Sequence, residues 1–522
     1  MAFLKFLTGL VVLIWLGTAL PAQASELTAL VYHDVTAEAG RESFSISRSM
    51  LASQMDYLKA NGYHPVSLEF LDRVRQGKAS LPEKALLLTF DDGLRSYSEF
   101  VVPLMKTCGY PTVVSVVGAW ADGSAVPDEY RGKLMSWDDL RKLRGNPLVE
   151  IISHSHNLHR QIPSNPQGNS DAAGVTRMYD RLTGTYESEA DFRRRIRDDL
   201  TQTVSEFKQQ IGIVPRAIAW PYGYYDQTLL EEKSHVGIGF HLTLENGPTA
   251  VSEFPKIRRI IVRNLDSLAG FIDDIQYKYQ LADQRVVEFS LDDFKGLTDA
   301  AREERLSRLL DRLQVLRVTT VILSPFTKDR REAFFFNRQM PVNTDILNRV
   351  LHQILTRLRI QHIYLKLPAV TAVSDPEDLY TDLARLNWFS GVVFDRSVNM
   401  TAEAGVRRVA AYYKPAMKFG TEGKGAPGQH YDFSVVRLGG GLSRAEIGKE
   451  IPLIKHSAGR HLVLLERPDT LDDQELAARL RLLRGLGVKD YGYSPDDYVA
   501  SRPAYQVVAP EMSARSSMRR EL

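Results

Sequence analysis

Residues Ala85–Gly93 have the sequence ALLLTFDDG, in which a short apolar run is followed by two adjacent aspartates and a glycine. An apolar run of this length that ends at a turn signal is typical of a strand buried on both faces. Asp91 and Asp92 would then lie at the carboxyl end of that strand, where parallel α/β folds carry their active sites. One carboxylate can bind a metal while the other handles a water or a proton. An Asx turn that caps the next helix is the alternative for these residues alone.

Strand and helix patterns alternate on both sides of this stretch. Short β-branched or apolar runs predict strands, and amphipathic stretches predict helices between them. Such alternation indicates a parallel α/β sheet or barrel. We predict strands at 27–35, 112–117, 149–153 and 217–220, helices at 47–60 and 189–210, a long surface loop at 161–179 and a glycine-rich loop at 420–429.

The length of the chain predicts two domains. Its 522 residues exceed what one hydrophobic core usually supports, and 44% of them are hydrophobic, which suffices for two cores. A second alternation of strands and helices starts near residue 286. We therefore predict a leader at 1–24, a first domain at 25–283, a second domain at 284–509 and a mobile tail at 510–522.

The first 24 residues have the pattern of a secretory signal peptide. Lys5 precedes an apolar run, and Ala22-Gln23-Ala24 forms an A-x-A cleavage site. The single cysteine, Cys108, lies far from this site and cannot carry a lipid there. We expect a periplasmic or secreted protein whose mature chain has no integral membrane span.

The overall charge argues against nucleic acid as a partner. The 66 basic and 64 acidic residues leave a net charge of +2, and no basic stripe interleaved with aromatic residues is present. A neutral or weakly charged substrate fits this balance better.

Three of the twelve histidines fall within residues 153–159, which have the sequence SHSHNLH and follow the predicted strand at 149–153. Two imidazoles and one carboxylate can form a facial set of metal ligands that leaves positions open for water and substrate. We predict that His154, His159 and Asp92 bind a divalent metal. Zinc, nickel, cobalt and iron suit these ligands equally. His156 is expected beside the ligands or facing solvent.

The strand at 217–220 ends in Trp220-Pro221-Tyr222-Gly223. Proline and glycine fix a turn that can direct the backbone N–H of Tyr222 into the site. A plain turn without a catalytic role is the alternative.

Taken together, these motifs resemble the polysaccharide deacetylases of carbohydrate esterase family 4. The Thr-Phe-Asp-Asp-Gly stretch, the histidine box and the Pro-Tyr-Gly turn occur in the order of that family. The five-residue spacing of the two histidines and the early Tyr32-His33-Asp34 are similar to one branch, the poly-β-1,6-N-acetyl-D-glucosamine N-deacetylases. The resemblance implies a distorted (β/α) barrel for the first domain.

The resemblance also implies a role for each motif residue. Asp92, His154 and His159 would hold the metal, Asp91 would be the general base and His33 the general acid. Tyr222 would supply an oxyanion-binding N–H. Arg259 either orients Asp91 or is a surface cation.

The second domain resembles the (β/α)8-type domain of the same branch, which binds the partly deacetylated polymer and can cut it. Here the domain is expected to be shortened between Phe394 and Gly487, and therefore incomplete. The acidic pair of the family is reduced to Asp395, next to Arg396, whereas glycosidases normally need two carboxylates. The adjacent cation is expected to favour the ionised form of Asp395, which is the wrong direction for a general acid. We predict a glycoside-hydrolase-like domain that binds polysaccharide without cutting it appreciably. Candidate stacking residues are Trp388, Tyr412, Tyr413, Tyr431, Tyr491 and Tyr493.

These observations predict a metal-dependent hydrolase of amide bonds that deacetylates poly-β-1,6-N-acetyl-D-glucosamine during exopolysaccharide export and biofilm formation. Export-machinery proteins are candidate partners besides the polymer. Deacetylation of peptidoglycan or chitin-type oligomers is one alternative, because the same site would support it. A binding protein without turnover is the other, and the presence of both an acid and a base argues against it.

Overall fold

The computed structural model describes residues 26–38, 44–264, 267–276, 283–360, 362–369, 373–423 and 430–512. The predicted signal peptide at 1–24 lies outside these residues. So does most of the predicted tail, although helix α15 (Tyr505–Met512) continues past its predicted start at residue 510.

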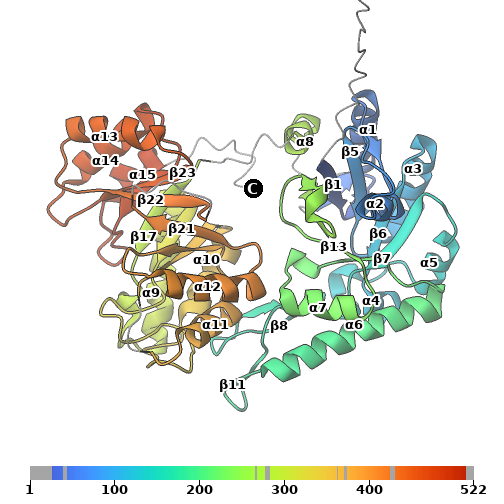
Figure 1. The fold of residues 1–522 in the computed structure, drawn as a ribbon, viewed down its shortest axis with the longest axis horizontal. Helices are drawn as coiled ribbons and strands as arrows, with labels where there is room; N and C mark the ends of the chain where they lie inside the picture. Colours follow the sequence, from blue (N-terminus) through green and yellow to red (C-terminus); the bar gives the residue numbers. More distant parts are fainter. Residues whose placement is uncertain are drawn as a thin grey trace, which may run out of the picture.

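One ten-stranded sheet forms the centre of the first domain (Figure 1). Its main path is β14-β1-β5-β6-β7-β12-β13-β15, and the neighbours from β1 to β15 are all parallel. The short β4 and β16 pair with β5 and β1. The strands are β1 (Glu26–Tyr32), β4 (His64–Pro65), β5 (Ala85–Phe90), β6 (Thr112–Val116), β7 (Val149–Ser153), β12 (Ala217–Ala219), β13 (Phe240–Leu242), β14 (Thr249–Ala250), β15 (Lys256–Ile257) and β16 (Ile260–Ile261).

Residues 256–261 bring the two ends of this sheet together. β15 pairs with β13, and β16, which starts three residues after β15 ends, pairs with β1. The sheet is therefore a nearly closed barrel, which confirms the predicted fold of this domain. Alternate strand residues fill its interior, including Leu27, Ala29, Leu87, Val113, Ile152, Ala219 and Leu242.

Helices cover the outside of this barrel (Figure 1). Most of them begin after a serine or aspartate whose side chain accepts a backbone N–H, as Ser188 does for α6, because such caps satisfy the free donors of a first turn. The helices are α1 (Arg48–Ala60), α2 (Leu68–Arg75), α3 (Val102–Cys108), α4 (Gly118–Ala121), α5 (Trp137–Leu143), α6 (Glu189–Ile211), α7 (Gln227–His235) and α8 (Leu268–Ile275).

The segment predicted as a long surface loop at 161–179 is more ordered than expected. It contains the antiparallel pair β8 (Gln161–Pro163) and β9 (Ser170–Ala172), and the pair β10 (Tyr179–Asp180) and β11 (Thr185–Tyr186) follows. The sequence predicted a loop because these strands are only two or three residues long. Hydrogen bonds between side chains of this segment and the second domain hold the short strands in place.

The second domain is a closed barrel of eight parallel strands. β17 pairs with both β18 and β24, which closes the ring. The strands are β17 (Arg285–Phe289), β18 (Thr320–Leu323), β19 (His362–Leu367), β20 (Gly391–Phe394), β21 (Lys418–Glu422), β22 (Phe433–Leu438), β23 (Arg460–Glu466) and β24 (Tyr491–Ser494). Its other helices are α9 (Asp299–Leu316), α10 (Leu347–Leu358), α11 (Pro376–Leu386), α12 (Met400–Tyr413), α13 (Arg444–His456) and α14 (Asp473–Gly485).

The prediction that this barrel is incomplete was wrong. Three strands, β21, β22 and β23, lie between Phe394 and Gly487. The predicted glycine-rich loop also starts inside β21. A Cβ atom at Gly420 would lie 2.4 Å from the ring of Phe433, so this strand needs glycine for close packing rather than for a turn.

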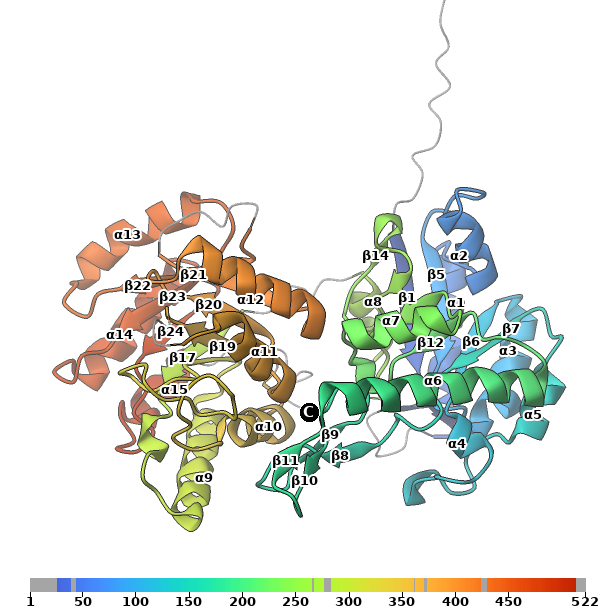
Figure 2. The same cartoon turned by 60° about the horizontal axis from the view of Figure 1, so that its bottom comes forward.

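The two domains contact each other through the 161–187 segment, α6 and α7 on one side and α10 to α12 on the other (Figures 1 and 2). Asn165 Nδ2 donates to Asn348 Oδ1 (2.7 Å), and Asp171 pairs with His352 Nδ1 (2.8 Å). The hydroxyl of Tyr412 contacts Arg193 and Thr228. The predicted sugar-stacking residues Tyr412 and Tyr413 therefore lie beside the first domain.

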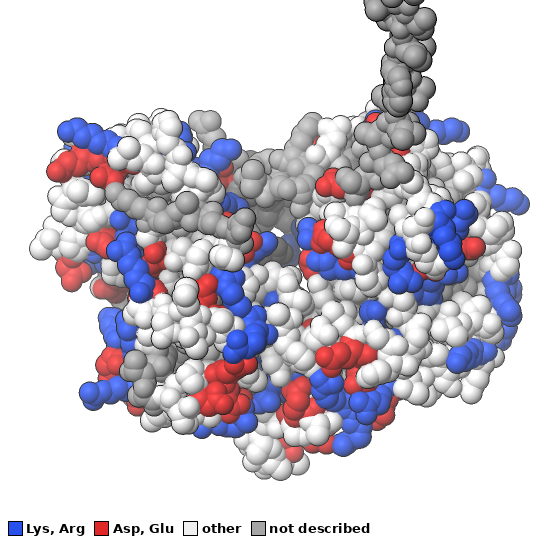
Figure 3. Space-filling model, viewed as in Figure 1, with Lys and Arg blue, Asp and Glu red and all other residues white. Residues whose placement is uncertain are grey.

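The surface carries both signs of charge. On the face shown in Figure 3, basic and acidic side chains are interspersed over both domains. None of the described helices is long and apolar enough to cross a membrane.

Candidate active site

The predicted site residues meet at the carboxyl ends of the strands of the first barrel. Along each strand, side chains two residues apart share a face. The positions that continue the interior rows of β1, β5 and β7 are His33, Asp91 and His154. On β6, Ser115 continues the row of the buried Val113. Strand alternation alone therefore places these side chains on the same end of the barrel interior.

Asp92 reaches the site by a different route. It is out of phase with Asp91, and it adopts a left-handed backbone with φ 72°. This conformation is uncommon for residues other than glycine, and it turns the Asp92 side chain toward the two histidines. Its Oδ1 lies 3.6 Å from His154 Nε2 and 3.5 Å from His159 Nε2.

The three side chains form a group that suits a divalent metal. One ligand atom from each of Asp92, His154 and His159 lies within 4.8 Å of the others. Within the described part of the chain, the buried Oδ1 of Asp92 has no hydrogen-bond partner. An unpartnered buried carboxylate oxygen is costly unless a cation or a donor occupies the space beside it. The donor set therefore fits the metal predicted from the sequence.

The histidines are held in states that suit ligands. His154 Nδ1 lies 2.7 Å from the carbonyl oxygen of Ala219, which can only accept, so Nδ1 carries the proton and Nε2 is free to ligate. Burial lowers the pKa of His159 to about 4, so its imidazole is neutral near pH 7.

Two aromatic residues beside the ligands were not predicted from the sequence. The hydroxyl of Tyr130 donates to Asp92 Oδ2 (3.1 Å), and the ring of Trp120 lies 4.8 Å from that of His159. The rings of Trp120 and Tyr130 are 4.7 Å apart. No local sequence pattern marks them, because a connecting segment brings them over the strand ends from outside the motifs.

Asp91 is held by a buried ion pair. Arg259 Nη1 donates to Asp91 Oδ1 (2.8 Å), and Ser115 Oγ donates to the same oxygen (2.7 Å). Burial raises the pKa of Asp91, but the charge and the hydrogen bond of Arg259 lower it by more, so the pKa lies below its usual range. Arg259 is fully buried, so it is the residue that orients Asp91 and not a surface cation.

Replacing Arg259 with methionine should destabilise the first domain by about 3–5 kcal/mol, because the Asp91 charge would be left buried without its partner. The pKa of Asp91 is lowered in the folded state, so the pair stabilises the fold above the ordinary aspartate pKa and loses this effect as pH falls. The difference in free energy of unfolding between the two proteins should therefore shrink in acid. Urea unfolding at several pH values measures it.

The double variant Asp91→Asn with Arg259→Met is the control, since it removes both charges. It should recover part of the lost stability. Additive effects of the two changes would mean that the pair contributes nothing.

His33 and Tyr222 lie at the rim of the site. His33 follows β1, and its buried Nδ1 has no hydrogen-bond partner among the described residues. Its ring lies 5.1 Å from the ring of Phe44. Tyr222 has a left-handed backbone (φ 58°), and its ring lies 4.6 Å from that of His159. The Pro-Tyr-Gly turn is therefore next to a predicted ligand, and the role of its N–H stays a prediction.

His156 does not join the metal-binding group. Its Nδ1 lies 3.0 Å from Glu206 Oε2 on α6, so the side chain is turned away from Asp92. This agrees with the expectation that it lies beside the ligands.

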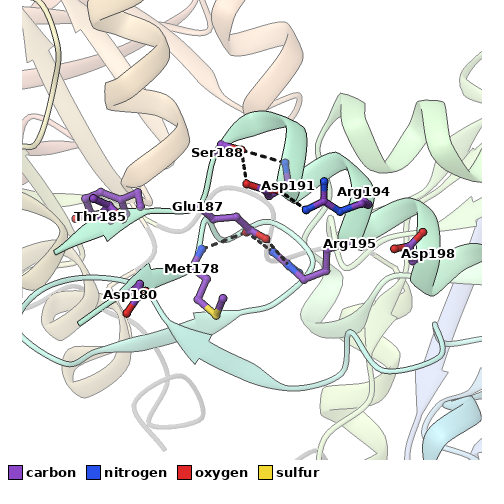
Figure 4. A pocket seen from close by; sticks show the side chains of 10 residues that line it. Met178, Asp180, Thr185, Glu187, Ser188, Asp191, Arg194, Arg195 and Asp198 are labelled. Atoms are coloured by element: carbon purple, nitrogen blue, oxygen red, sulfur yellow. Dashed lines mark hydrogen bonds and ion pairs between the residues drawn. The ribbon is translucent and has the colours of Figure 1, made fainter. Parts of the chain in front are cut away.

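A separate pocket lies between the β10–β11 hairpin and the first turns of α6 (Figure 4). Arg195 and Glu187 form a two-pronged ion pair in its wall, and Arg194 contacts Asp191. The charges that line the pocket are therefore largely paired with each other. None of the lining residues belongs to the predicted site.

The mouth of the second barrel holds more carboxylates than the sequence indicated. The side chains of Glu288, Glu422 and Arg437 meet at the carboxyl ends of their strands. Along the strands, they lie two positions beyond the apolar layer that fills the barrel interior. Arg437 Nη2 lies 2.5 Å from Glu288 and 2.7 Å from Glu422, and Lys366 lies 2.9 Å from Glu422. Both carboxylates are thus paired with cations.

Asp395 is ionised for a reason that differs from the expected one. Burial raises its pKa, but the N–H of Ser397 (2.8 Å), Lys366 and Arg330 lower it below its usual range. The predicted direction was right, whereas the cations responsible are not the adjacent Arg396. Of the proposed stacking residues, Tyr491 and Tyr493 are fully buried in the core.

Two family models match the chain. Residues 289–377 match a model described as hypothetical glycosyl hydrolase family 13. Residues 78–241 match the model of the polysaccharide deacetylases. This segment is similar to the polysaccharide deacetylase family. The match includes Asp91, Asp92, His154, His159 and Tyr222, and His33 precedes it.

Individual relatives agree with the family models. The poly-β-1,6-N-acetyl-D-glucosamine N-deacetylase of Escherichia coli K12 is 31% identical over 361 residues, which are 67% of this chain and 54% of the relative. The chain therefore spans about half the length of the curated relatives that it matches.

Solved structures are similar to parts of this chain. The deacetylase domain of a Bordetella bronchiseptica protein is 32% identical and covers 46% of this chain and 96% of its own, with a TM-score of 0.41. A glycoside hydrolase domain from the same species is 18% identical and covers 45% of this chain and all of its own, with a TM-score of 0.39.

Proposed function

We propose that this protein is a metal-dependent hydrolase that removes acetyl groups from poly-β-1,6-N-acetyl-D-glucosamine. The observation that carries the proposal is the group formed by Asp92, His154 and His159, with Asp91 and His33 at the same barrel end. A binding protein would have no need of ligands, base and acid together. The name of the Escherichia coli relative supports the choice of polymer.

The chain supplies each step of amide hydrolysis. A bound divalent cation would polarise the acetamide carbonyl and make a neighbouring water more acidic. Asp91 accepts the proton of that water as its oxygen forms a bond to the carbonyl carbon. The N–H of Tyr222 donates to the oxyanion that develops. When the carbon–nitrogen bond breaks, His33 donates a proton to the amine, and acetate and a free amino sugar result.

Replacing His33 with alanine should lower turnover by about 10²–10⁴-fold, since the leaving amine would lose its proton donor. Metal content should not change, because His33 is not among the three ligands. Acetate release and metal analysis on the same preparation test this. Turnover close to that of the unmodified protein would assign the proton donor to another residue.

The decisive experiment measures acetate release from poly-N-acetylglucosamine with and without a chelator. We expect release that the chelator stops and that added zinc, nickel, cobalt or iron restores. Peptidoglycan fragments and chitin oligomers serve as competing substrates, and faster release from either would change the proposed polymer. Binding of the polymer without acetate release under any metal would make the protein a binding module.

We further propose that the second domain binds the partly deacetylated polymer. Its support is the polar layer at the mouth of a closed barrel, since sites of this fold lie at that end. The reaction is expected outside the cytoplasm, because residues 1–24 have the pattern of a signal peptide. Export-machinery proteins remain candidate partners.

The second domain should not cut the polymer appreciably. Asp395 is ionised, and Glu288 and Glu422 are paired with cations, whereas a general acid must hold its proton near neutral pH. Incubation of the full chain with partly deacetylated polymer should leave its length unchanged. Shortened products that disappear in Asp395→Asn would show a working glycosidase.

A further inference from the structure

The middle of the turn between the two proposed histidine ligands is held by helix α6. Asp199 Oδ1 accepts from the backbone N–H of His156 (3.0 Å), and its Oδ2 accepts from that of Asn157 (2.7 Å). These two residues lie between His154 and His159 in the sequence. One carboxylate thus fixes the middle of the segment that carries both ligands.

A second carboxylate of α6 holds the same residue. Glu206 is seven positions after Asp199 and so lies on the same face of the helix. Its Oε2 contacts His156 Nδ1 (3.0 Å), and its Oε1 accepts from Gln202 Nε2 (2.9 Å). The backbone and the ring of His156 are therefore both bound to α6.

The opposite side of the turn contacts helix α4. The carbonyl oxygens of Ser155 and His156 accept from the N–H groups of Gly118 and Ala119 (3.1 and 3.0 Å). Ser155 has φ 73°, a conformation that costs energy for a residue other than glycine and needs support from its surroundings. The hydrogen bonds from the N–H groups of His156 and Asn157 to Asp199 support the same turn from its other side.

We propose that Asp199 is a positioning residue that holds His154 and His159 in the geometry required for metal binding. This inference rests on the proposed metal site. An asparagine at position 199 would keep the size of the side chain. Its NH2 group would however face one of the two backbone N–H groups, and two donors cannot form a hydrogen bond with each other. One of the two hydrogen bonds would then be lost, and the turn would be free to move.

The test is titration of cobalt(II) into the metal-free full chain, because cobalt binding can be followed without any substrate. In Asp199→Asn we expect cobalt affinity to fall by about 10- to 100-fold, the range for groups that orient metal ligands. The visible spectrum of the saturated protein should also change, since it reports the arrangement of the ligands. A structural role alone would leave that spectrum as it is.

Glu150→Gln is the matched control. Glu150 is also a largely buried carboxylate that accepts a backbone N–H, from Leu68 (3.1 Å), and it lies in β7, the strand that leads to His154. Burial raises the pKa of both carboxyl groups. This control should lose a similar amount of stability while its cobalt affinity and spectrum stay unchanged.

Glu206→Gln provides a second variant if Asp199→Asn does not fold. It should weaken cobalt binding in the same direction, because it loosens the same turn. Unchanged affinity and spectrum in Asp199→Asn, or in Glu206→Gln when only that variant folds, would overturn the inference while leaving the proposed function intact. Cobalt binding that survives Asp92→Ala would instead overturn the metal site itself.

Discussion

Replacing Asp92 with alanine is expected to abolish metal binding and acetate release together. Asp92 supplies the only carboxylate of the three-residue group, and both histidine nitrogens lie within 3.6 Å of its Oδ1. Two neutral imidazoles without this charge bind divalent metals much more weakly. Acetate release should fall to the level measured with chelator, and metal analysis of the purified protein should show less than one tenth of the unmodified content.

The fold should survive this change, because Asp92 lies after the end of β5 and its Oδ1 has no hydrogen-bond partner among the described residues. The change removes one hydrogen bond, from Tyr130 to Oδ2, but it also removes a buried charge with an unpartnered oxygen, which can even raise stability. Thermal unfolding of the metal-free proteins checks this point. Asp299→Ala is the control for an aspartate-to-alanine change, since Asp299 is an exposed residue of the second domain that pairs with Arg302. Normal metal content in Asp92→Ala would refute the assigned ligands.

Asp91→Asn should keep the metal and lose most turnover. Its Oδ1 contacts Arg259 and Ser115, and none of these residues belongs to the metal-binding group. Asparagine cannot accept the proton of the attacking water, so we expect kcat to fall by about 10²–10⁴-fold, as for other general acid–base groups. Metal content, measured on the same sample, should stay close to that of the unmodified protein.

Ser115→Ala is the control for this prediction. It removes a neutral hydrogen bond to Asp91 but leaves the carboxylate in place, so its effect on kcat should be much smaller. Loss of the metal in Asp91→Asn would exchange the roles of the two aspartates.

Much of the site was predictable from the sequence because its residues follow buried strands directly. Asp91, His154 and Tyr222 each come within a few residues of an apolar run, and the carboxyl ends of parallel strands meet on one side of a barrel. The alternation of side chains then determines which of them face the interior. Local patterns carry this information, so the motifs could be placed without a structure.

The second barrel was predicted less well. Its eight strands are short, and β21 contains a glycine that local composition assigns to a loop. Only the packing of Phe433 against Gly420 shows why this glycine belongs in a strand. Glu288 and Glu422 likewise come together only because the barrel closes.

The sequence by itself therefore determined where most strands of the first domain lie along the chain and the fold class of the two domains, and it predicted the set of residues proposed for the site. Only the tertiary structure decided which groups support that set. Arg259 reaches Asp91 because residues 256–261 cross from β13 to β1 and close the barrel. Asp199 reaches the ligand turn because α6 packs beside β7. Such contacts join residues that are far apart in the chain, and they depend on packing geometry, which no local pattern encodes.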